Sequence, residues 1–409
     1  MEFAFSVRTE QLRSALLDFM TSSVYPAEEV LRAQVAGSEH SLTFEAPIKD
    51  QLKAEARSRG LWNLFLPDDK WGAGLTNLEY APLAEITGRS NDLAPEALNC
   101  SAPDTGNMEL LALFGTPEQQ DRWLVPLLAG EIRSTYAMTE PEVASSDASN
   151  IQTRIERQGD EYVINGHKWW ASGAMRERCQ LLFVLGVSST DAGAHNRHSV
   201  VLVPRDTPGI NIIRSTTVFG YTHPTFGGHA EIVFDDVHVP VDNLLGQEGN
   251  GFGMAQARLG PGRIHHCMRL LGQAERALEL MCRRAQERVM FGKTLADQGV
   301  VQEWIADARI EIEQARLLVL KTAWLMDTVG NKGARTEISA IKVVVPSVAS
   351  RVIDHAIQAY GGAGVSGDVP LASMYTDARY LRIGDGPDEV HRMSVARREL
   401  RKYDSPNAG

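Results

Sequence analysis

Paired cysteines and long apolar runs are both missing from this 409-residue sequence. Its four cysteines are scattered and form no C-x-x-C pair, so neither a zinc site nor a disulfide framework is predicted, and a reducing compartment such as the cytoplasm is expected. No run of about 18 apolar residues occurs, which argues against a membrane span. The first residues, MEFAFSVRTEQL, lack the charged start and apolar core of a secretory signal, so secretion is not expected either.

Positive charge is also scarce. The chain carries 41 lysines and arginines against 52 aspartates and glutamates, which gives a formal net charge of −11. Because nucleic-acid binding relies on a basic surface that neutralises phosphates, this balance argues against a general nucleic-acid binder. No H-E-x-x-H spacing, G-x-S-x-G elbow or phosphate-binding loop is present, and the adjacent His265 and His266 diverge by about 100° on a helix, so no metal site is expected.

What is present is a hydrophobic pattern that changes its period twice. Residues 1–134 read as helical, residues 135–246 as short strands separated by turns, and residues 247–409 as long amphipathic helices. The strands lack the intervening helices of βαβ units, which favours an antiparallel barrel or sandwich. The sequence thus predicts a multi-domain α+β protein with a helical N-terminal domain, an antiparallel β middle domain and a C-terminal four-helix bundle.

Two dipeptides in the middle segment carry structural expectations. Asn165-Gly166 is a strong hairpin-turn signal. The adjacent Trp169 and Trp170 would point to opposite faces of a strand, which leaves at least one of them on a surface that needs a flat partner. Packing against the core is the ordinary alternative for both rings.

Five short segments stand out as candidates for chemistry. They place hydroxyl groups, tryptophans, an arginine, clustered glycines and carboxylates in turns or at helix ends, where backbone groups can approach a ligand. In chain order they are YAMTEP at 136–141, NGHKWWASG at 165–173, RVMFGK at 288–293, QAYGGAG at 358–364 and GDGPDEVH at 384–391.

Each segment taken alone also has a purely structural explanation. A cation such as Arg288 at a helix C-terminus is favourable by about 0.3–1 kcal/mol without any ligand, and glycines after a helix are a common stop signal. Asp388 is placed to cap the last helix, whereas Glu389 and His391 fit either a structural or a functional role. The five segments therefore become specific only in combination.

Together and in this order, the five segments resemble the acyl-CoA dehydrogenase family over nearly the whole chain. LGPGRIHHC, the tandem tryptophans and DGPDEVH are similar to the branch whose animal members are fused to a phosphotransferase-like kinase domain, which this sequence does not contain. The resemblance implies an FAD flavoprotein of fatty-acid β-oxidation. Its expected reaction is the α,β-dehydrogenation of an acyl-CoA to a trans-2-enoyl-CoA, in which a base removes the α-proton and hydride passes from Cβ to flavin N5.

The resemblance assigns one set of flavin contacts to the middle segment. Trp170 is expected to cover one flavin face, and Ser172 to hydrogen-bond near N5. Because the turn after the glutamate of YAMTEP has one extra residue, the expected flavin contact Ser146 can slip to Ser145, which otherwise faces the substrate. The remaining cofactor contacts that the family implies are Tyr136, Met138, Thr139, Pro387 and Glu389.

A second set of FAD contacts is expected to reach the flavin of a neighbouring subunit. A site shared in this way implies a homo-oligomer, either a dimer or a tetramer. The family also implies an electron-transfer flavoprotein as the electron acceptor. The residues of this second set are Arg288, Phe291, Gln358, Gly361 and Gly362.

The expected base is Asp385, at a position where most relatives carry a glutamate. Arg263 resembles the arginine that orients the catalytic loop and the CoA moiety, and it is expected to follow a helix start. Gly386 is an expected substrate contact, and Pro387 stands where relatives carry a threonine. Some relatives place the base just before the arginine, but Gly262 occupies that position here. Because an aspartate is a weak base in water, substrate binding is expected to desolvate it.

Three alternatives stay open beside this reaction. A flavoprotein of the same fold can eliminate or isomerise a 4-phosphorylated or 4-hydroxy acyl-CoA, and an acyl-CoA oxidase passes its electrons to oxygen. A non-catalytic flavin-binding scaffold is the third, and the presence of Asp385, Arg263 and Trp170 argues against it. The spacing of the segments does not set the depth of the acyl pocket, so no chain length is predicted.

Overall fold

The computed structural model describes residues 4–189, 193 and 196–404. The chain folds into two compact units, each assembled from separated stretches of sequence. The helical unit contains the start of the chain up to Thr21, Leu75–Pro95 and the described residues from Gly260 onward. The sheet-containing unit consists of Ser22–Gly74 and Glu96–Leu259. Within the described part of the chain, no helix combines the length and apolar character needed to cross a membrane.

Helices occupy the chain up to residue 128, which confirms the predicted helical start. Ser6, Thr76 and Thr116 each accept a hydrogen bond from the backbone N–H three residues later, the usual way to satisfy a free donor at a helix start. The helices are α1 (Val7–Phe19), α2 (Tyr25–Ala36), α3 (Pro47–Ser58), α4 (Asn77–Gly88), α5 (Ala94–Ala97), α6 (Asp104–Phe114), α7 (Pro117–Gln119) and α8 (Val125–Leu128).

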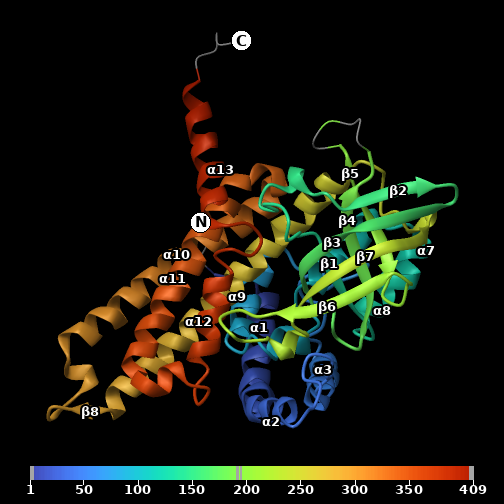
Figure 1. Cartoon of the computed structure of the whole chain (residues 1–409). Helices are drawn as coiled ribbons and strands as arrows, with labels where there is room; N and C mark the ends of the chain where they lie inside the picture. Colours follow the sequence, from blue (N-terminus) through green and yellow to red (C-terminus); the bar gives the residue numbers. More distant parts are fainter. Residues whose placement is uncertain (1–3, 190–192, 194–195, 405–409) are drawn as a thin grey trace. The chain divides into compact units, whose positions relative to one another are not determined.

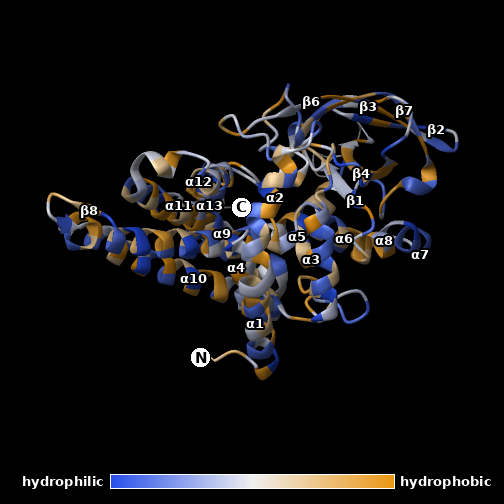
Figure 2. Cartoon of the chain, turned by 90° about the horizontal axis from the view of Figure 1, so that it is seen from below, coloured by the Kyte–Doolittle hydropathy of each residue, from blue (hydrophilic) through white to orange (hydrophobic). Residues whose placement is uncertain are grey.

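Long helices follow the sheet in the chain, as predicted. Their apolar stripes are buried, from Cys267 to Ala285 in α9 and from Ile338 to Ala356 in α11. Figure 1 shows α10 and α11 side by side, and Figure 2 shows hydrophobic and hydrophilic residues alternating along them, as amphipathic helices require. The elements are α9 (Gly251–Glu287), β8 (Val289–Met290), β9 (Lys293–Thr294), α10 (Gly299–Gly333), α11 (Arg335–Tyr360), α12 (Leu371–Tyr380) and α13 (Asp388–Leu400).

One helix start differs from the prediction. Arg263 does not follow a helix start, because α9 begins at Gly251 and continues through Pro261. α11 likewise continues through Pro346. A proline removes only one backbone donor from a helix, so favourable packing on the flanking turns can carry the helix past it. Arg263 is therefore held by helical backbone on both sides.

The middle segment forms a curled, mostly antiparallel sheet of seven strands. The strand order is β1-β4-β2-β3-β7-β6, and β5 pairs with β4. β4 runs parallel to β1 and β2, whereas the other pairings are antiparallel. The strands are β1 (Arg133–Ala137), β2 (Arg154–Gln158), β3 (Glu161–Ser172), β4 (Cys179–Val187), β5 (His198–Pro204), β6 (Ile210–Thr216) and β7 (His229–Pro240).

The predicted turn at Asn165-Gly166 is wrong. The β2–β3 hairpin turns at Gly159-Asp160, and β3 runs through Asn165-Gly166 with a register shift against β7. The Asn165 amide both donates to and accepts from Asp236, at 2.9 Å each. A Cβ on Gly166 would lie 2.3 Å from Thr153 Oγ1. Long-range partners thus keep this dipeptide inside a strand, opposite the extra residue that bulges β7 at Asp235-Asp236.

The two adjacent tryptophans do not point to opposite faces as predicted. Trp170 has a left-handed backbone with φ of 54°, at a second register shift of β3 against β7. This irregularity breaks the alternation of side chains, so the rings of Trp169 and Trp170 meet edge to face at 6.2 Å. At this strand end the Trp170 ring and the Ser172 hydroxyl both approach His229.

An apolar core fills the inside of the curled sheet. It gathers side chains from β1, β2, β3, β4, β5 and β7, including Ala137 at the end of β1 and Ala171 near the end of β3. Because a packed core resists rearrangement, it gives the polar segments that follow β1 and end β3 a rigid support. Its fully buried members include Ala137, Ile155, Ile164, Ala171, Leu182, Val201, Val203, Ile232 and Val237.

Candidate functional site

A buried ion pair fixes the turn that follows β1. Lys168, on β3, donates from Nζ to Met138 O and to Glu140 Oε1, both at 2.8 Å. The Lys168 and Glu140 side chains are only 0% and 3% exposed. Burial lowers the pKa of Lys168 to about 8 against the attraction of Glu140. A lysine in the protein interior therefore ties the backbone and the side chain of the Met138–Pro141 turn to the sheet.

The carboxylate of Glu140 is saturated with donors. Gln152 N donates to it at 2.7 Å, and Thr153 donates from its N at 2.9 Å and from its hydroxyl at 2.6 Å. Burial alone would raise the pKa of Glu140, but the charge of Lys168 and these hydrogen bonds outweigh it and lower the pKa. These contacts within the protein fix the turn without a bound ligand.

The two serines of this turn differ in placement. Ser145 donates from Oγ to Glu140 O at 3.2 Å and lies 2.9 Å from Glu140 N, whose N–H it accepts, so it fastens the turn to itself. Ser146 is exposed. Thr139 O accepts a hydrogen bond from Trp169 N, which joins the turn to β3. The structure therefore brings Met138, Thr139 and Ser145 together next to the strand that carries the tryptophans.

The other residues predicted to contact the flavin ring lie near the end of β3. The half-buried Trp170 ring lies 5.2 Å from the His229 ring, and Ser172 Oγ lies 2.8 Å from His229 Nδ1. On β1 the buried Tyr136 ring is covered by the Arg258 guanidinium at 4.4 Å, a cation–π contact. Trp170 thus offers a partly open aromatic surface with a hydroxyl two residues away.

In the helical unit, the loop around Asp385 is anchored through its backbone. Arg263 Nε donates to Asp385 O at 3.0 Å, and His391 Nε2 lies 3.2 Å from the same oxygen. The Asp385 side chain points elsewhere, 22% exposed, with Oδ2 3.5 Å from His266 Nε2. One residue distant in sequence and one nearby residue thus hold the main chain while the carboxylate stays 22% exposed.

The backbone of this loop needs its glycine. Asp385 and Gly386 have φ of 58° and 105°, a left-handed region that aspartate tolerates better than most side chains and that glycine adopts freely. A Cβ on Gly386 would lie 2.9 Å from His391 Nε2. A Cβ on Gly262 would lie 3.6 Å from Asp385 Oδ2. Gly262 therefore faces the same carboxylate, and the two alternative base positions converge in space.

Buried cations and a neutral histidine surround the Asp385 loop. Lys342, 1% exposed, donates to Leu381 O. Burial lowers the pKa of Lys342 and of Arg263, and the charge of Asp385 opposes the shift in both. Burial, helped by Arg263 and Lys342, lowers the pKa of His391 to about 4. At neutral pH His391 is therefore an uncharged hydrogen-bond partner of the loop.

Asp388 does not cap α13 as predicted, since the capping position is Pro387. Asp388 is instead the first residue of the helix, and it closes the loop. Its Oδ2 accepts from two nitrogens of Arg382 at 2.8 Å, and its N donates to Arg382 O at 3.1 Å. The proline side chain has no oxygen to accept a hydrogen bond from the first turn of the helix, and the Arg382–Asp388 salt bridge holds the two ends of the loop together instead. Glu389, next in sequence, is exposed on α13.

Arg288 links the ends of two helices. It follows the last residue of α9 and donates from Nη1 to Ala359 O at 3.3 Å and Tyr360 O at 3.0 Å, at the end of α11. Gly361 allows this approach, because a Cβ there would lie 3.2 Å from Arg288 Nη1. Arg288 thus complements the negative end of α11 and lies beside the glycine segment predicted to share its role.

The other residues of the shared-site prediction lie at the surface. Phe291 is 93% exposed at the tip of the β8–β9 hairpin, with a left-handed φ of 49°. Gln358 and Gly362 are exposed. An aromatic ring that has no cover within its own unit is unusual when the surrounding positions are also apolar, as Val289 and Met290 are.

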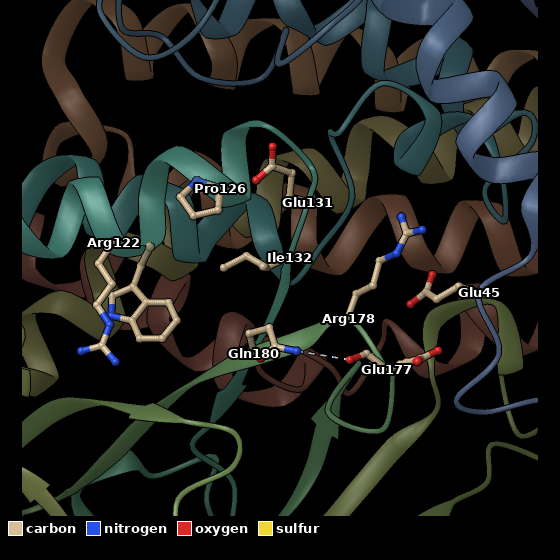
Figure 3. A pocket seen from close by; sticks show the side chains of 9 residues that line it. Glu45, Arg122, Pro126, Glu131, Ile132, Glu177, Arg178 and Gln180 are labelled. Carbon is tan, nitrogen blue, oxygen red and sulfur yellow. Dashed lines mark hydrogen bonds between the residues drawn. The ribbon is translucent and has the colours of Figure 1, made fainter.

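A pocket of about 520 Å³ lies in the sheet-containing unit, away from all residues predicted to act (Figure 3). Arg122 lies over the Trp123 ring at 4.5 Å, and Gln180 donates to Glu177 O. Arg178 is paired with Asp50 at 2.7 Å. None of the residues that line this pocket belongs to the five segments predicted to act, so we assign it no role.

Several residues near the candidate segments were not predicted from the sequence, notably Lys168, His229, Lys342 and Arg258. For Lys168 a signal was available, because it has the same parity in β3 as the buried Tyr162 and Ile164. A lysine on the inner face of a strand requires a buried acid. The other three have no such local signal, since their partners lie in distant segments.

Comparisons with known proteins agree with this arrangement. Three domain models of one family match the chain in order. They describe the N-terminal domain of acyl-CoA dehydrogenase over residues 8–131, its middle domain over residues 135–237 and its C-terminal domain over residues 249–400.

Individual relatives are similar over nearly the full chain. Probable acyl-CoA dehydrogenase FadE2 of Mycobacterium tuberculosis is 57% identical over 408 residues, which are 99% of this chain and 98% of that protein. Acyl-CoA dehydrogenase family member 10 of Mus musculus is 54% identical over 97% of this chain, but only 37% of that longer protein is covered. The solved butyryl-CoA dehydrogenase of Megasphaera elsdenii is 28% identical with a TM-score of 0.83, covering 98% and 100% of the two chains. The chain belongs to the acyl-CoA dehydrogenase family.

Proposed function

We propose that this protein is an FAD-dependent dehydrogenase that converts an acyl-CoA to the trans-2-enoyl-CoA. The observation that carries the proposal is the Asp385 loop, where Arg263 and His391 hold the backbone carbonyl and leave the carboxylate accessible. A base that must reach a substrate carbon needs this combination of fixed main chain and open side chain.

The residues at the end of β3 fit a flavin. The half-buried Trp170 ring offers a flat apolar surface, and the left-handed backbone presents Ser172 beside it. The Lys168–Glu140 pair holds the Met138–Pro141 turn in place beneath. In this assignment Tyr136, Met138, Thr139 and Trp170 hold the ring, with Ser172 near N5. When bound, FAD supplies the hydride acceptor.

The protein's own part of the reaction lies with Asp385. Its carboxylate accepts the α-proton, and its backbone N–H is our candidate donor to the thioester carbonyl, whose polarisation acidifies that proton. Arg263 positions the loop through the Asp385 carbonyl. Gly386, which lets the chain turn sharply, brings the main chain close to the substrate. Pro387 and Glu389 stay assigned to the cofactor side of this loop.

We further propose that two subunits complete each flavin site. Arg288 and Gly361 lie together, Gln358 and Gly362 are exposed beside them, and Phe291 projects into solvent. These features suit a surface that meets the FAD of a partner, which makes the protein a dimer or a tetramer. Electrons then leave through an electron-transfer flavoprotein, and the three segments 1–134, 135–246 and 247–409 act as N-terminal, middle and C-terminal domains.

The test starts with the purified protein, which is expected to be yellow and to hold about one FAD per chain. A panel of acyl-CoA thioesters, including 4-hydroxy and 4-phospho substrates, is then added without oxygen. Bleaching of the flavin supports net oxidation, whereas turnover with an oxidised flavin indicates elimination or isomerisation. Peroxide release in air indicates an oxidase. Colourless protein that cannot be reconstituted with FAD contradicts the proposal.

A further inference from the structure

Two histidines behind Ser172 form a hydrogen-bonded chain that the proposed reaction leaves unexplained. Ser172 Oγ lies 2.8 Å from His229 Nδ1, and His229 Nε2 lies 2.9 Å from His223 Nδ1. The His223 and His229 rings meet edge to face, 5.2 Å apart at 79°. Both nitrogens of His229 are therefore engaged, one with the hydroxyl and one with the second ring.

The local backbone is built around this chain. His223 has a left-handed φ of 50° in the connection between β6 and β7, a conformation that costs most side chains about 1 kcal/mol or more. Thr216 donates from its hydroxyl to His229 O at 3.0 Å, and His229 N donates to Ser215 Oγ at 3.1 Å. These hydrogen bonds from β6 hold the His229 backbone, and the His229 ring lies against His223.

His229 is uncharged under ordinary conditions. It is 5% exposed and His223 is 8% exposed. Burial, reinforced by the neighbouring His223, lowers the pKa of His229 to about 3. A neutral imidazole has one nitrogen that donates and one that accepts. Both hydrogen bonds of His229 must therefore run in the same direction along the chain.

Only two arrangements satisfy this condition. In the first, Ser172 donates to His229 Nδ1, and its hydrogen is used inside the protein. In the second, His223 donates to His229 Nε2 and His229 Nδ1–H donates to Ser172 Oγ, which leaves the Ser172 hydrogen free to point outward. The tautomer of His229 therefore decides whether Ser172 acts as a donor toward a ligand.

We propose that His229 and His223 are positioning residues that hold Ser172 as a hydrogen-bond donor toward the ring nitrogen of an oxidised flavin, with His229 Nδ1–H donating to Ser172 Oγ. This inference rests on the proposed FAD site, since an oxidised flavin offers an acceptor at N5. The histidines touch no reacting atom and act through the serine hydroxyl.

The direct test is the tautomer of His229 in the intact flavoprotein. Protein labelled with ¹⁵N-histidine is examined by NMR with oxidised FAD bound, and the His229 signals are identified by their loss in His229→Phe or His229→Asn. We expect Nδ1 to carry the hydrogen. An unprotonated Nδ1 with FAD bound overturns the proposal, and this result does not depend on any variant retaining function.

A double-mutant cycle separates positioning from simple packing against Trp170. Ser172→Ala and His229→Phe are each expected to raise the Kd for FAD about two- to tenfold, the value of one neutral hydrogen bond. The double variant is expected to bind no more weakly than Ser172→Ala alone. If the two effects add, His229 acts on the ring by packing and the proposal is wrong. His238→Phe, on the exposed side of β7, is the matched control and leaves Kd unchanged.

Failure of the proposed function remains distinguishable from failure of this inference. If the wild-type protein binds no FAD, the flavin assignment falls by itself. The apoprotein then still reports the link: Ser172→Ala is expected to change the ratio of His229 tautomers. An unchanged ratio in the apoprotein shows that the hydroxyl and the ring are not coupled, which overturns the positioning role.

Discussion

The candidate segments of the two units are held in opposite ways. In the sheet-containing unit, a buried lysine and a buried glutamate clamp the Met138–Pro141 turn, and nearly every polar atom of the pair is satisfied within the protein. In the helical unit, Arg263 and His391 grip a backbone carbonyl, and the Asp385 carboxylate stays accessible.

The difference follows from what each segment has to do. A turn that only supports a bound ring can use its charges internally, because those charges gain by being paired once buried. A loop that supplies a base cannot, because a carboxylate already saturated with donors is a poor proton acceptor. In the helical unit, the neutral His391 and Arg263 therefore contact the Asp385 main chain and not its carboxylate.

The largest expected effect comes from removing the open carboxylate. Asp385→Asn is nearly isosteric and leaves the anchored carbonyl in place, so fold and FAD content should persist while turnover falls about 10²–10⁴-fold. Steady-state kinetics with a dye acceptor measures the loss. Glu389→Gln, exposed on α13, tests the competing candidate for the base. If Asp385→Asn retains near-normal turnover and Glu389→Gln abolishes it with FAD still bound, the base is assigned wrongly.

Breaking the buried clamp should act on stability before activity. Lys168→Met leaves Glu140 buried without its cation, at an expected loss of about 3–5 kcal/mol in the free energy of unfolding. Urea unfolding measures it, and adding Glu140→Gln should recover part of the loss. Lys402→Met removes a surface partner of Glu399 and is expected to leave the urea midpoint nearly unchanged. If Lys168→Met and Lys402→Met changed stability equally in urea, the buried ion pair would not be what fixes the Met138–Pro141 turn.

Arg288→Ala tests whether the helical unit also contributes a charged clamp to a neighbouring flavin. Loss of a charge-assisted bond to a phosphate, about 1.5–3 kcal/mol each, should lower FAD content or dissociate the oligomer. Absorbance of bound flavin and light scattering of the native protein read the two outcomes. Arg283→Ala, exposed on the same helix, serves as control. Unchanged FAD content and mass mean that Arg288 only complements the end of α11.

The smallest expected effect concerns Glu109, a buried acid that lacks a full set of hydrogen-bond partners. Burial raises the pKa of Glu109 to about 8, although the charge of Arg258 opposes this. Because the folded pKa lies above the unfolded value of 4.5, the stabilising contribution is complete below about pH 4.5 and is lost as the pH rises through 8. Glu109→Gln should therefore match the wild type near pH 5 and melt at a higher temperature at pH 9.

Melting curves from pH 5 to 9 compare the two proteins, with exposed Glu131→Gln as the control. A gap between wild type and Glu109→Gln that stays constant with pH contradicts the raised pKa. Glu140 in the same unit behaves in the opposite sense, since its pKa is lowered. Burial raises the pKa of both glutamates, and for Glu140 the charge of Lys168 and the hydrogen bonds that it accepts outweigh this effect.

The sequence by itself determined the order of helical and β segments and the stripes that fill the helix cores. These features depend on spacings of two to four residues, which a short window contains. It also pointed to the segments that hold Trp170, Arg288 and Asp385, because glycines and prolines mark sharp turns locally.

Only the tertiary structure decided how those segments are used. Asn165-Gly166 became part of a strand because Asp236 and Thr153 meet it from other strands, and Asp385 depends on Arg263, 122 residues earlier in the chain. Local spacing cannot specify such partners, since their contact exists only after the chain has folded. Periodicity therefore predicts which face of an element is buried, while the partner of each buried polar group is settled by packing.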